Sequence, residues 1–167
     1  MNIIPYEPPM RQAALDLALR AWKPVFPQLK AAVPGFVYGA FYPEEWQKRQ
    51  LSDLGQILDN EPHTVDVAML QGQSGSETPQ LAGWVCTRIH PEDSMGEVYI
   101  LAVDPQFQRR GIGHALMDHS HDRARAAGMT MMMVETGGDP GHAPARHTYE
   151  AAGYQRWPVA RYFKNLQ

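Results

Sequence analysis

Apolar residues at the start of the chain follow first the period of a strand and then that of a helix. A short strand is expected at Ile3 and Ile4, and it ends before the prolines at positions 8 and 9. Apolar residues then recur at i, i+3, i+4 and i+7, at Leu15, Ala18, Leu19 and Trp22. This spacing is typical of an amphipathic helix with one buried face.

The next segment lacks a clear period. Residues 23–42 are predicted to be mostly loop, because proline interrupts regular structure and three prolines occur here: Pro24, Pro27 and Pro34. A second helix is predicted from about Pro43, since Glu44 and Glu45 suit the positive end of a helix dipole. Its apolar stripe consists of Leu51, Leu54 and Leu58.

Three strands are predicted in the middle of the chain. Residues 64–70 and 81–89 have strand character, and the polar loop QGQSGSETPQ between them predicts a hairpin. Residues 97–103 are rich in β-branched and aromatic side chains and end at an Asp-Pro pair. Proline cannot donate to a ladder, so this strand stops there.

Helices and strands alternate in the C-terminal part. We expect a helix over residues 111–127 closed by Gly128, a strand over 129–135 and a short helix over 144–152. The tail over residues 154–163 is expected to form one or two strands around Pro158. The chain of 167 residues is thus predicted to be a single mixed α/β domain, residues 1–167, around one central sheet.

Composition narrows the classes of function. The net charge of −3 argues against a broad nucleic-acid-binding face, and no run of eighteen apolar residues predicts a membrane helix. The N-terminus lacks the basic leader and apolar run of a signal peptide. A single cysteine, Cys86, permits no intrachain disulfide and fits a reducing cytoplasm. We therefore expect a cytoplasmic protein without nucleic-acid or membrane partners; homodimer formation stays open.

One segment carries the features of a phosphate site. The strand ending at Val103 is followed by the turn DPQFQRRGIGH, which opens a helix. Unpaired N–H groups at a helix N-terminus attract anions, glycines allow close approach, and Arg109 and Arg110 add positive charge. The alternative is a surface turn that happens to contain arginines. The phosphate motifs G-x-x-x-x-G-K-[ST] and G-x-G-x-x-G are both absent from the sequence.

Metal and serine-hydrolase chemistry find no support in the sequence. The histidines at positions 114, 119 and 121 lack the i, i+4 spacing that would place two ligands on one helix face, and there is no second cysteine. No metal site is expected. No G-x-S-x-G nucleophile motif occurs either.

The segment QRRGIG resembles the acyl-CoA signature [Q/R]-x-x-G-x-[G/A] of the GNAT superfamily of N-acetyltransferases. The preceding LAVDP is similar to the end of that superfamily's fourth strand. ARHTYEAAGY, residues 145–154, resembles its late A-x-x-x-Y-E-x-x-G-[F/Y] helix. The resemblance implies a GNAT-like α/β (mixed α+β) fold, with a central mixed, mostly antiparallel twisted sheet flanked by helices.

The resemblance also implies acetyl-CoA as cosubstrate and assigns residues to it. Backbone contacts to the pantetheine arm fall on Leu101, Ala102 and Val103, with the Leu101 N–H facing the acetyl carbonyl. The pyrophosphate falls on the following turn: Gln108, Arg109, Arg110, Gly111, Ile112, Gly113 and His114. The alternative for the strand is an ordinary core strand, and both roles can coexist because the backbone binds while the side chains pack.

Two side chains match catalytic positions of the family. Glu97 matches a position where relatives often carry a base, and strand alternation is expected to place it on the same face as Leu101. Tyr149 matches a tyrosine that protonates the departing thiolate. The alternatives are a solvated strand-end glutamate and a half-buried helix tyrosine. His142 replaces an asparagine that often bonds the pantetheine arm, so its cofactor role is an open question.

The expected acceptor is a small-molecule or peptide amine that attacks acetyl-CoA directly. In similar proteins the first two helices and their connection form one wall of the acceptor site. That region carries Trp22, Phe26, Phe36, Tyr38, Phe41, Tyr42 and Trp46, most of which could equally fill the core. The competing functions are a non-catalytic acyl-CoA-binding or regulatory module on the same fold, and an unrelated nucleotide-binding α/β protein.

Overall fold

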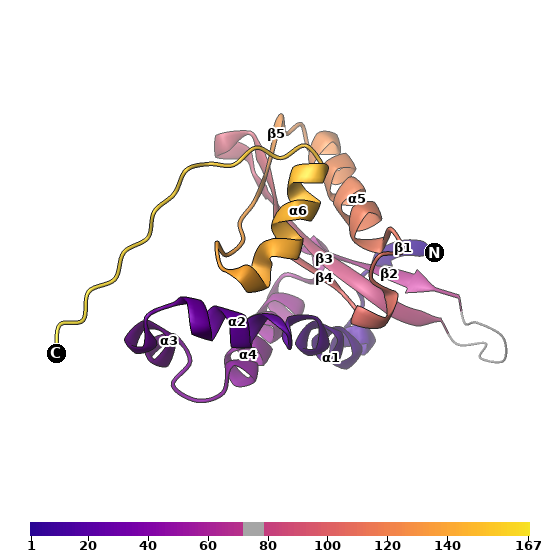
Figure 1. Ribbon diagram of the computed structural model, residues 1–167. Helices are drawn as coiled ribbons and strands as arrows, with labels where there is room; N and C mark the ends of the chain where they lie inside the picture. Colours follow the sequence, from indigo (N-terminus) through magenta and orange to yellow (C-terminus); the bar gives the residue numbers. More distant parts are fainter. Residues whose placement is uncertain (72–78) are drawn as a thin grey trace.

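A computed structural model describes residues 1–71 and 79–167, and its described strands form one five-stranded sheet in the order β1-β2-β3-β4-β5 (Figure 1). Neighbouring strands are antiparallel except β4 and β5, which are parallel. The strands are β1 Asn2–Pro5, β2 Val65–Leu70, β3 Gln80–His90, β4 Met95–Val103 and β5 Met131–Val134. The predicted mixed, mostly antiparallel sheet is confirmed. The tip of the predicted β2–β3 hairpin, residues 72–78, lies outside the described residues.

Helices cover both faces of the sheet. Helices α1 to α4 lie below it in Figure 1 and α5 lies above it. They are α1 Arg11–Trp22, α2 Val25–Ala32, α3 Gly35–Phe41, α4 Trp46–Asn60, α5 Ile112–Ala126 and α6 Ala143–Ala151. One buried cluster joins α1 and α4 to the sheet around Trp84, and a second joins α5 to the opposite face around Leu116. The sheet is therefore the middle layer of the domain.

The prediction of a loop over residues 23–42 is wrong, because α2 and α3 occupy most of it. Pro24 and Pro34 are the N-cap residues of these helices, and Pro27 lies in the first turn of α2. The first N–H groups of a helix have no intrahelical partner, so proline costs little at such positions. The three prolines mark where the helices begin rather than a break in the chain.

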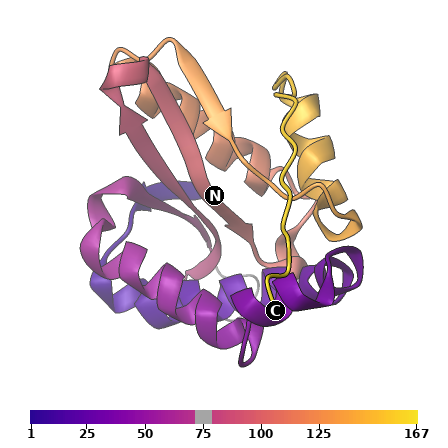
Figure 2. The same cartoon turned by 90° about the vertical axis from the view of Figure 1, so that its left-hand side faces the viewer.

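The tail also differs from the prediction. Residues 154–167 contain no strand, and they run past α6 toward the N-terminal helices (Figure 2). Trp157 and Tyr162 are 84 % and 90 % exposed. The tail touches the body at Arg161, which pairs with Glu135 at 3.3 Å, and at Phe163, whose ring packs against Phe41. Its apolar residues suit a strand, but the tail forms no ladder with β5.

A bulge interrupts the pairing of β3 with β4. Cys86 lies opposite Ile100, whereas the next residue, Thr87, lies opposite Val98, so Tyr99 is the extra residue. A single extra residue reverses the faces to which the following side chains point. Residues before and after Tyr99 therefore do not follow one alternation.

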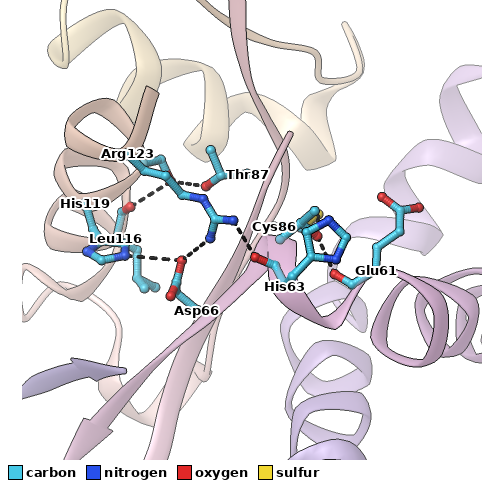
Figure 3. Close-up of polar contacts among 10 residues, drawn as sticks. Glu61, His63, Asp66, Cys86, Thr87, Leu116, His119 and Arg123 are labelled. Atoms are coloured by element: carbon cyan, nitrogen blue, oxygen red, sulfur yellow. Dashed lines mark hydrogen bonds and ion pairs between the residues drawn. The ribbon is translucent and has the colours of Figure 1, made fainter. Parts of the chain in front are cut away.

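A buried polar cluster ties α5 to the sheet (Figure 3). Asp66 of β2 is 5 % exposed, and its Oδ2 accepts a hydrogen bond from Arg123 at 2.9 Å and lies 3.2 Å from His119. Beside it, the Thr87 hydroxyl donates to Ser120 of α5 at 2.8 Å. These contacts fix the position of α5, whose first turn carries the predicted phosphate site.

Replacing Asp66 by Asn is expected to lower the free energy of unfolding by about 1–3 kcal/mol, because the substitution weakens a charge-assisted contact to two basic side chains. The expected loss of unfolding free energy is smaller than for a fully buried pair, because Arg123 is 30 % exposed and can be hydrated. Urea denaturation measures the change. Asp122→Asn, at an exposed pair with Arg125, is the control and should have little effect. Equal stability of the two variants would contradict the role given to Asp66.

Candidate functional site

An opening between β4 and β5 forms the centre of the candidate site. The two strands pair only from Met95 to Val98 on β4, and β5 then turns away (Figure 2). On the opposite edge, Ile100 to Val103 pair with β3. In the described part of the chain, the edge of Tyr99–Val103 that faces β5 has no strand partner. Backbone N–H and C=O groups without a strand partner can bind an extended ligand as a neighbouring strand would.

The turn after β4 is held by Asp104. This carboxylate is 2 % exposed and accepts hydrogen bonds from the Gln106 N–H at 3.1 Å and from Arg20 of α1 at 2.6 and 3.0 Å. The Gln108 amide donates to the Val103 carbonyl at 3.2 Å. These bonds connect the open strand directly to the glycine-containing turn and set its direction.

The turn has the backbone geometry of an anion site. Arg109 and Gly111 have positive φ values of 58° and 79°, and Gly111 is the N-cap of α5. Closely spaced left-handed residues before a helix form a concave surface of N–H groups at the positive end of the dipole. Both arginine side chains, Arg109 and Arg110, are exposed. The turn can therefore add positive charge to that surface.

The two glycines of the turn leave room beside its backbone. A Cβ on Gly111 would meet no atom within 4 Å, and one on Gly113 would lie 3.6 Å from the Val103 methyl group. Ile112 is buried in the core, which anchors the helix start, whereas His114 is exposed. The residues predicted for the cofactor are thus contiguous, with their backbone accessible from outside.

Tyr149 lies on α6 and is half-buried, and burial raises the pKa of its hydroxyl above the ordinary value. Its ring centroid lies 6.1 Å from that of Tyr154, whose hydroxyl is 2.8 Å from His121 Nε2. Burial, reinforced by Tyr149, raises the pKa of Tyr154 to about 12. Both phenols are therefore protonated at neutral pH, as a proton donor must be.

Glu97 lies on β4 before the bulge, and the prediction that it shares a face with Leu101 is wrong. Leu101 packs with the α5-side cluster, which also contains Val98, the residue next to Glu97. Glu97 therefore points to the opposite face, toward α1 and α4. Its side chain is 13 % exposed and its Oε2 lies 2.8 Å from His90 Nε2. Glu97 is thus a partly enclosed carboxylate with a specific partner, and not a free strand-end glutamate.

His142 is bound into the loop that precedes α6. Its Nδ1 lies 2.6 Å from Asp139 Oδ2, while Asp139 Oδ1 accepts from the Gly141 N–H at 2.9 Å. The same loop packs on α2, because a Cβ on Gly141 would come within 2.7 Å of the Val25 carbonyl. His142 therefore orders the loop between β5 and α6, and its contact with a cofactor stays a prediction.

The aromatic residues expected at the acceptor wall differ in exposure. Phe26 is 4 % exposed and stacks on Trp46 with centroids 4.1 Å apart, so it belongs to the core. Phe36 and Phe41 are 43 % and 39 % exposed on α3. Phe36 and Phe41 therefore offer the most surface to an acceptor, and Trp22, Tyr38, Tyr42 and Trp46 are partly exposed.

Two features near the opening were missed by sequence reasoning. Tyr99 is the bulged residue where β4 and β5 separate, and the Arg88 guanidinium lies 3.4 Å from its ring centroid. Arg88 in turn donates two hydrogen bonds to Glu61, at 2.8 and 2.9 Å. No sequence signal marks a bulge or a pairing between residues 27 positions apart. The arrangement leaves an aromatic ring, with a guanidinium on one face, at the apex of the opening.

Two cavities lie beside the sheet, and the first is lined in part by Arg88 and His90. One, of about 390 Å³, lies beside the end of β3 between Glu61 and Arg123; the other, of about 700 Å³, lies between α5, the start of β5 and the end of α6. Neither is lined by the turn at residues 108–114. An extended ligand can bind along the open edge of β4 without a closed cavity, because exposed backbone groups suffice to hold it.

Within residues 1–71 and 79–167, no three His, Cys, Asp or Glu side chains gather as a metal site would require. Among the same residues, no helix is both long enough and apolar enough to cross a membrane.

Known proteins share this architecture. The family model described as "Acetyltransferase (GNAT) family" matches residues 36–154. Mycothiol acetyltransferase of Rhodococcus jostii is 27 % identical over 148 residues, which cover 85 % of this chain and 47 % of that protein. The chain thus spans about half the length of this relative.

Two solved structures have the same fold at low sequence identity. The aminoglycoside 6'-N-acetyltransferase of Acinetobacter haemolyticus has a TM-score of 0.62 at 14 % identity, covering 99 % of this chain and 98 % of that chain. The ribosomal-protein-S18-alanine N-acetyltransferase of Escherichia coli has a TM-score of 0.56 at 20 % identity, covering 99 % and 84 %. The family match covers both the glycine-containing turn and the Tyr149 helix, and the chain belongs to the acetyltransferase (GNAT) family.

Proposed function

We propose that this protein is an acetyl-CoA-dependent N-acetyltransferase that transfers the acetyl group to an amine by direct attack. The observation that carries the proposal is the unpaired edge of β4, which leads without interruption into the turn at the start of α5. An extended arm with a diphosphate at one end and a thioester at the other fits both parts. Membership of the GNAT family supports the same cosubstrate.

The cosubstrate would lie along the backbone of β4. The diphosphate binds the N–H groups and arginines of the turn, and the pantetheine arm pairs with Leu101, Ala102 and Val103. A donor at Leu101 N–H would stabilise the negative charge that develops on the acetyl oxygen. Tyr149 and Glu97 lie on different elements, α6 and β4. The departing thiolate could thus receive its proton from one group, and the acceptor ammonium could lose its proton to another.

The proposed acetyl transfer begins with deprotonation of the acceptor. Glu97 accepts a proton from the acceptor ammonium, and the neutral amine attacks the thioester carbon. A C–N bond forms and the C–S bond breaks. The hydroxyl of Tyr149 gives its proton to the departing thiolate, the product nitrogen loses its remaining ammonium proton to solvent, and the Tyr149 phenolate takes up a proton from solvent.

The acceptor is proposed to be a primary amine that reaches the opening from the side of Tyr99 and α3. Tyr99 and Phe41 are 42 % and 39 % exposed, so each ring could contact an apolar or cationic group that carries the amine. The relationship to mycothiol acetyltransferase favours a small molecule over a protein. An acceptor panel should therefore contain amino sugars, amino acids, arylalkylamines and one peptide with a free N-terminus.

Binding of acetyl-CoA is expected to raise the melting temperature, because a ligand at ~100 times its dissociation constant stabilises the folded state by ~2.7 kcal/mol. Thermal shift with acetyl-CoA, coenzyme A and ATP tests this, followed by thiol release with the acceptor panel. Binding without thiol release from any amine would favour a non-catalytic module. A shift with ATP but none with either coenzyme would contradict the proposed cosubstrate and favour an unrelated nucleotide-binding protein.

A further inference from the structure

We propose that His90 is a positioning and relay residue that carries the proton taken up by Glu97 to solvent. The inference rests on the proposed function, and it adds a residue that neither the sequence motifs nor the family match indicates. It concerns the turn between β3 and β4, at the end of the sheet away from the phosphate turn.

The three side chains of this turn form a series of increasing exposure. Glu97 is 13 % exposed, His90 is 30 % exposed and Glu92 is 70 % exposed. His90 Nε2 lies 2.8 Å from Glu97 Oε2, while its Nδ1 lies 3.7 Å from Glu92 Oε1. The imidazole therefore connects an enclosed carboxylate to the surface, with one ring nitrogen turned to each side.

The backbone holds this arrangement in place. His90 is opposite Met95 in the ladder, and Ser94, between the two strands, has a positive φ of 52°. The Ser94 carbonyl accepts hydrogen bonds from the N–H groups of Thr130 and Met131, at 2.9 and 3.3 Å. Because the turn is tied to β5, the distance between His90 and Glu97 does not depend on a mobile loop.

The other polar groups on this face are less suited to accept the proton. Arg88, the ladder partner of Glu97, carries a guanidinium that has no acceptor atom. Its nitrogens are engaged by Glu61, and its carbon covers the Tyr99 ring. Cys86 is fully buried, and burial raises the pKa of its thiol, so it stays neutral. Imidazole both accepts and donates near neutral pH, which leaves His90 as the suitable carrier.

The relay conserves atoms and charge. Glu97, protonated by the acceptor ammonium, passes the proton to the free electron pair of His90 Nε2. The imidazolium that forms beside Glu97 and Glu92 then releases its Nδ1 proton to water. Exchange with water, which removes the Nε2 proton and returns one to Nδ1, restores the tautomer that accepts from Glu97. One proton moves from acceptor to solvent and no electrons are exchanged.

The test is acetyl-transfer kinetics of His90→Ala with and without added imidazole, using an amine that the wild-type protein acetylates. We expect turnover to fall about tenfold, as is typical when a residue that is hydrogen-bonded to a functional group is lost. Millimolar imidazole should restore a large part of this turnover, with the Michaelis constant for acetyl-CoA unchanged. Glu97→Gln should lose turnover that imidazole does not restore. His63→Ala, an exposed histidine that lines the same cavity as His90, is the matched control and should keep full turnover.

The outcomes separate the two proposals. If the wild-type protein releases no thiol with any amine, the proposed function fails, and the relay fails with it. If the wild-type protein is active but His90→Ala keeps full turnover, only the relay is overturned. Loss of turnover that imidazole leaves unchanged also overturns it, because a merely structural histidine cannot be replaced by a free base. His90→Gln, which keeps a hydrogen bond to Glu97, serves if the alanine variant does not fold, and it should show the same loss because an amide does not carry protons.

Discussion

Replacing Tyr149 by Phe is expected to lower the turnover of acetyl transfer by about 10²–10⁴-fold, the usual contribution of a general acid. The affinity for acetyl-CoA should change little, since the open edge of β4 and the phosphate turn keep their backbone. The substitution removes the hydroxyl and retains the ring, so the packing against Tyr154 survives. Kinetics on an identified acceptor and calorimetric binding of acetyl-CoA together measure the two effects.

The raised pKa of Tyr149 determines how turnover should depend on pH. A free tyrosine has a pKa near ~10 and a thiol near ~8.5, so proton transfer to a formed thiolate is uphill in water. Burial raises the pKa of Tyr149, which keeps the proton on the phenol over the whole neutral range. Transfer must therefore accompany cleavage of the C–S bond. We expect no loss of turnover from ionisation of Tyr149 below pH ~10.

Tyr154→Phe is the matched control for Tyr149→Phe. Tyr154 is the neighbouring phenol, but its hydroxyl is engaged with His121 at 2.8 Å. Its loss should lower stability and leave turnover nearly unchanged. Near-normal turnover of Tyr149→Phe, measured where chemistry limits the rate, would remove the proton-donor role and leave Glu97, His142 or water as the source of the proton.

Local signals predicted the part of the fold that carries the candidate site. The strand before Asp104, the turn and α5 lie within residues 95–126, and each is marked by a short pattern that acts through its own backbone. Gly111 and Gly128 have φ values of 79° and 80° at the two ends of α5, as their places in the sequence suggest. Local structure of this kind can be predicted from the sequence, because contacts between residues close in the chain require particular residues at fixed spacing.

The parts that were not predicted depend on distant contacts or on residues with two common uses. Pro24 and Pro34 could break the chain or begin a helix, and in the fold each is the N-cap of a helix. The bulge at Tyr99 results from the register between β3 and β4, which single residues do not encode. It reversed the expected face of Glu97 and placed that side chain beside His90. The roles of Glu97, Tyr149 and His142 stay predictions.

Replacing Gly111 by Ala is expected to weaken acetyl-CoA binding by about 5–150-fold. The added Cβ would meet no protein atom within 4 Å, so any steric effect must come from the ligand that approaches there. Inserting a methyl group into a close contact costs ~1–3 kcal/mol, and ~1.4 kcal/mol corresponds to a tenfold change in affinity. Isothermal titration calorimetry with acetyl-CoA measures the change.

Backbone strain is a second effect of Gly111→Ala, and Gly128→Ala isolates it. The two glycines lie at opposite ends of α5 with φ values of 79° and 80°, and a Cβ on either meets nothing within 4 Å. Each alanine should therefore destabilise the free protein similarly, by ~1–2 kcal/mol for a left-handed residue. Only Gly111→Ala should also lose affinity, since Gly128 lies at the far end of the helix from the phosphate turn. Equal affinity of both variants would show that the diphosphate does not approach Gly111, and the binding site would then have to be sought elsewhere along β4.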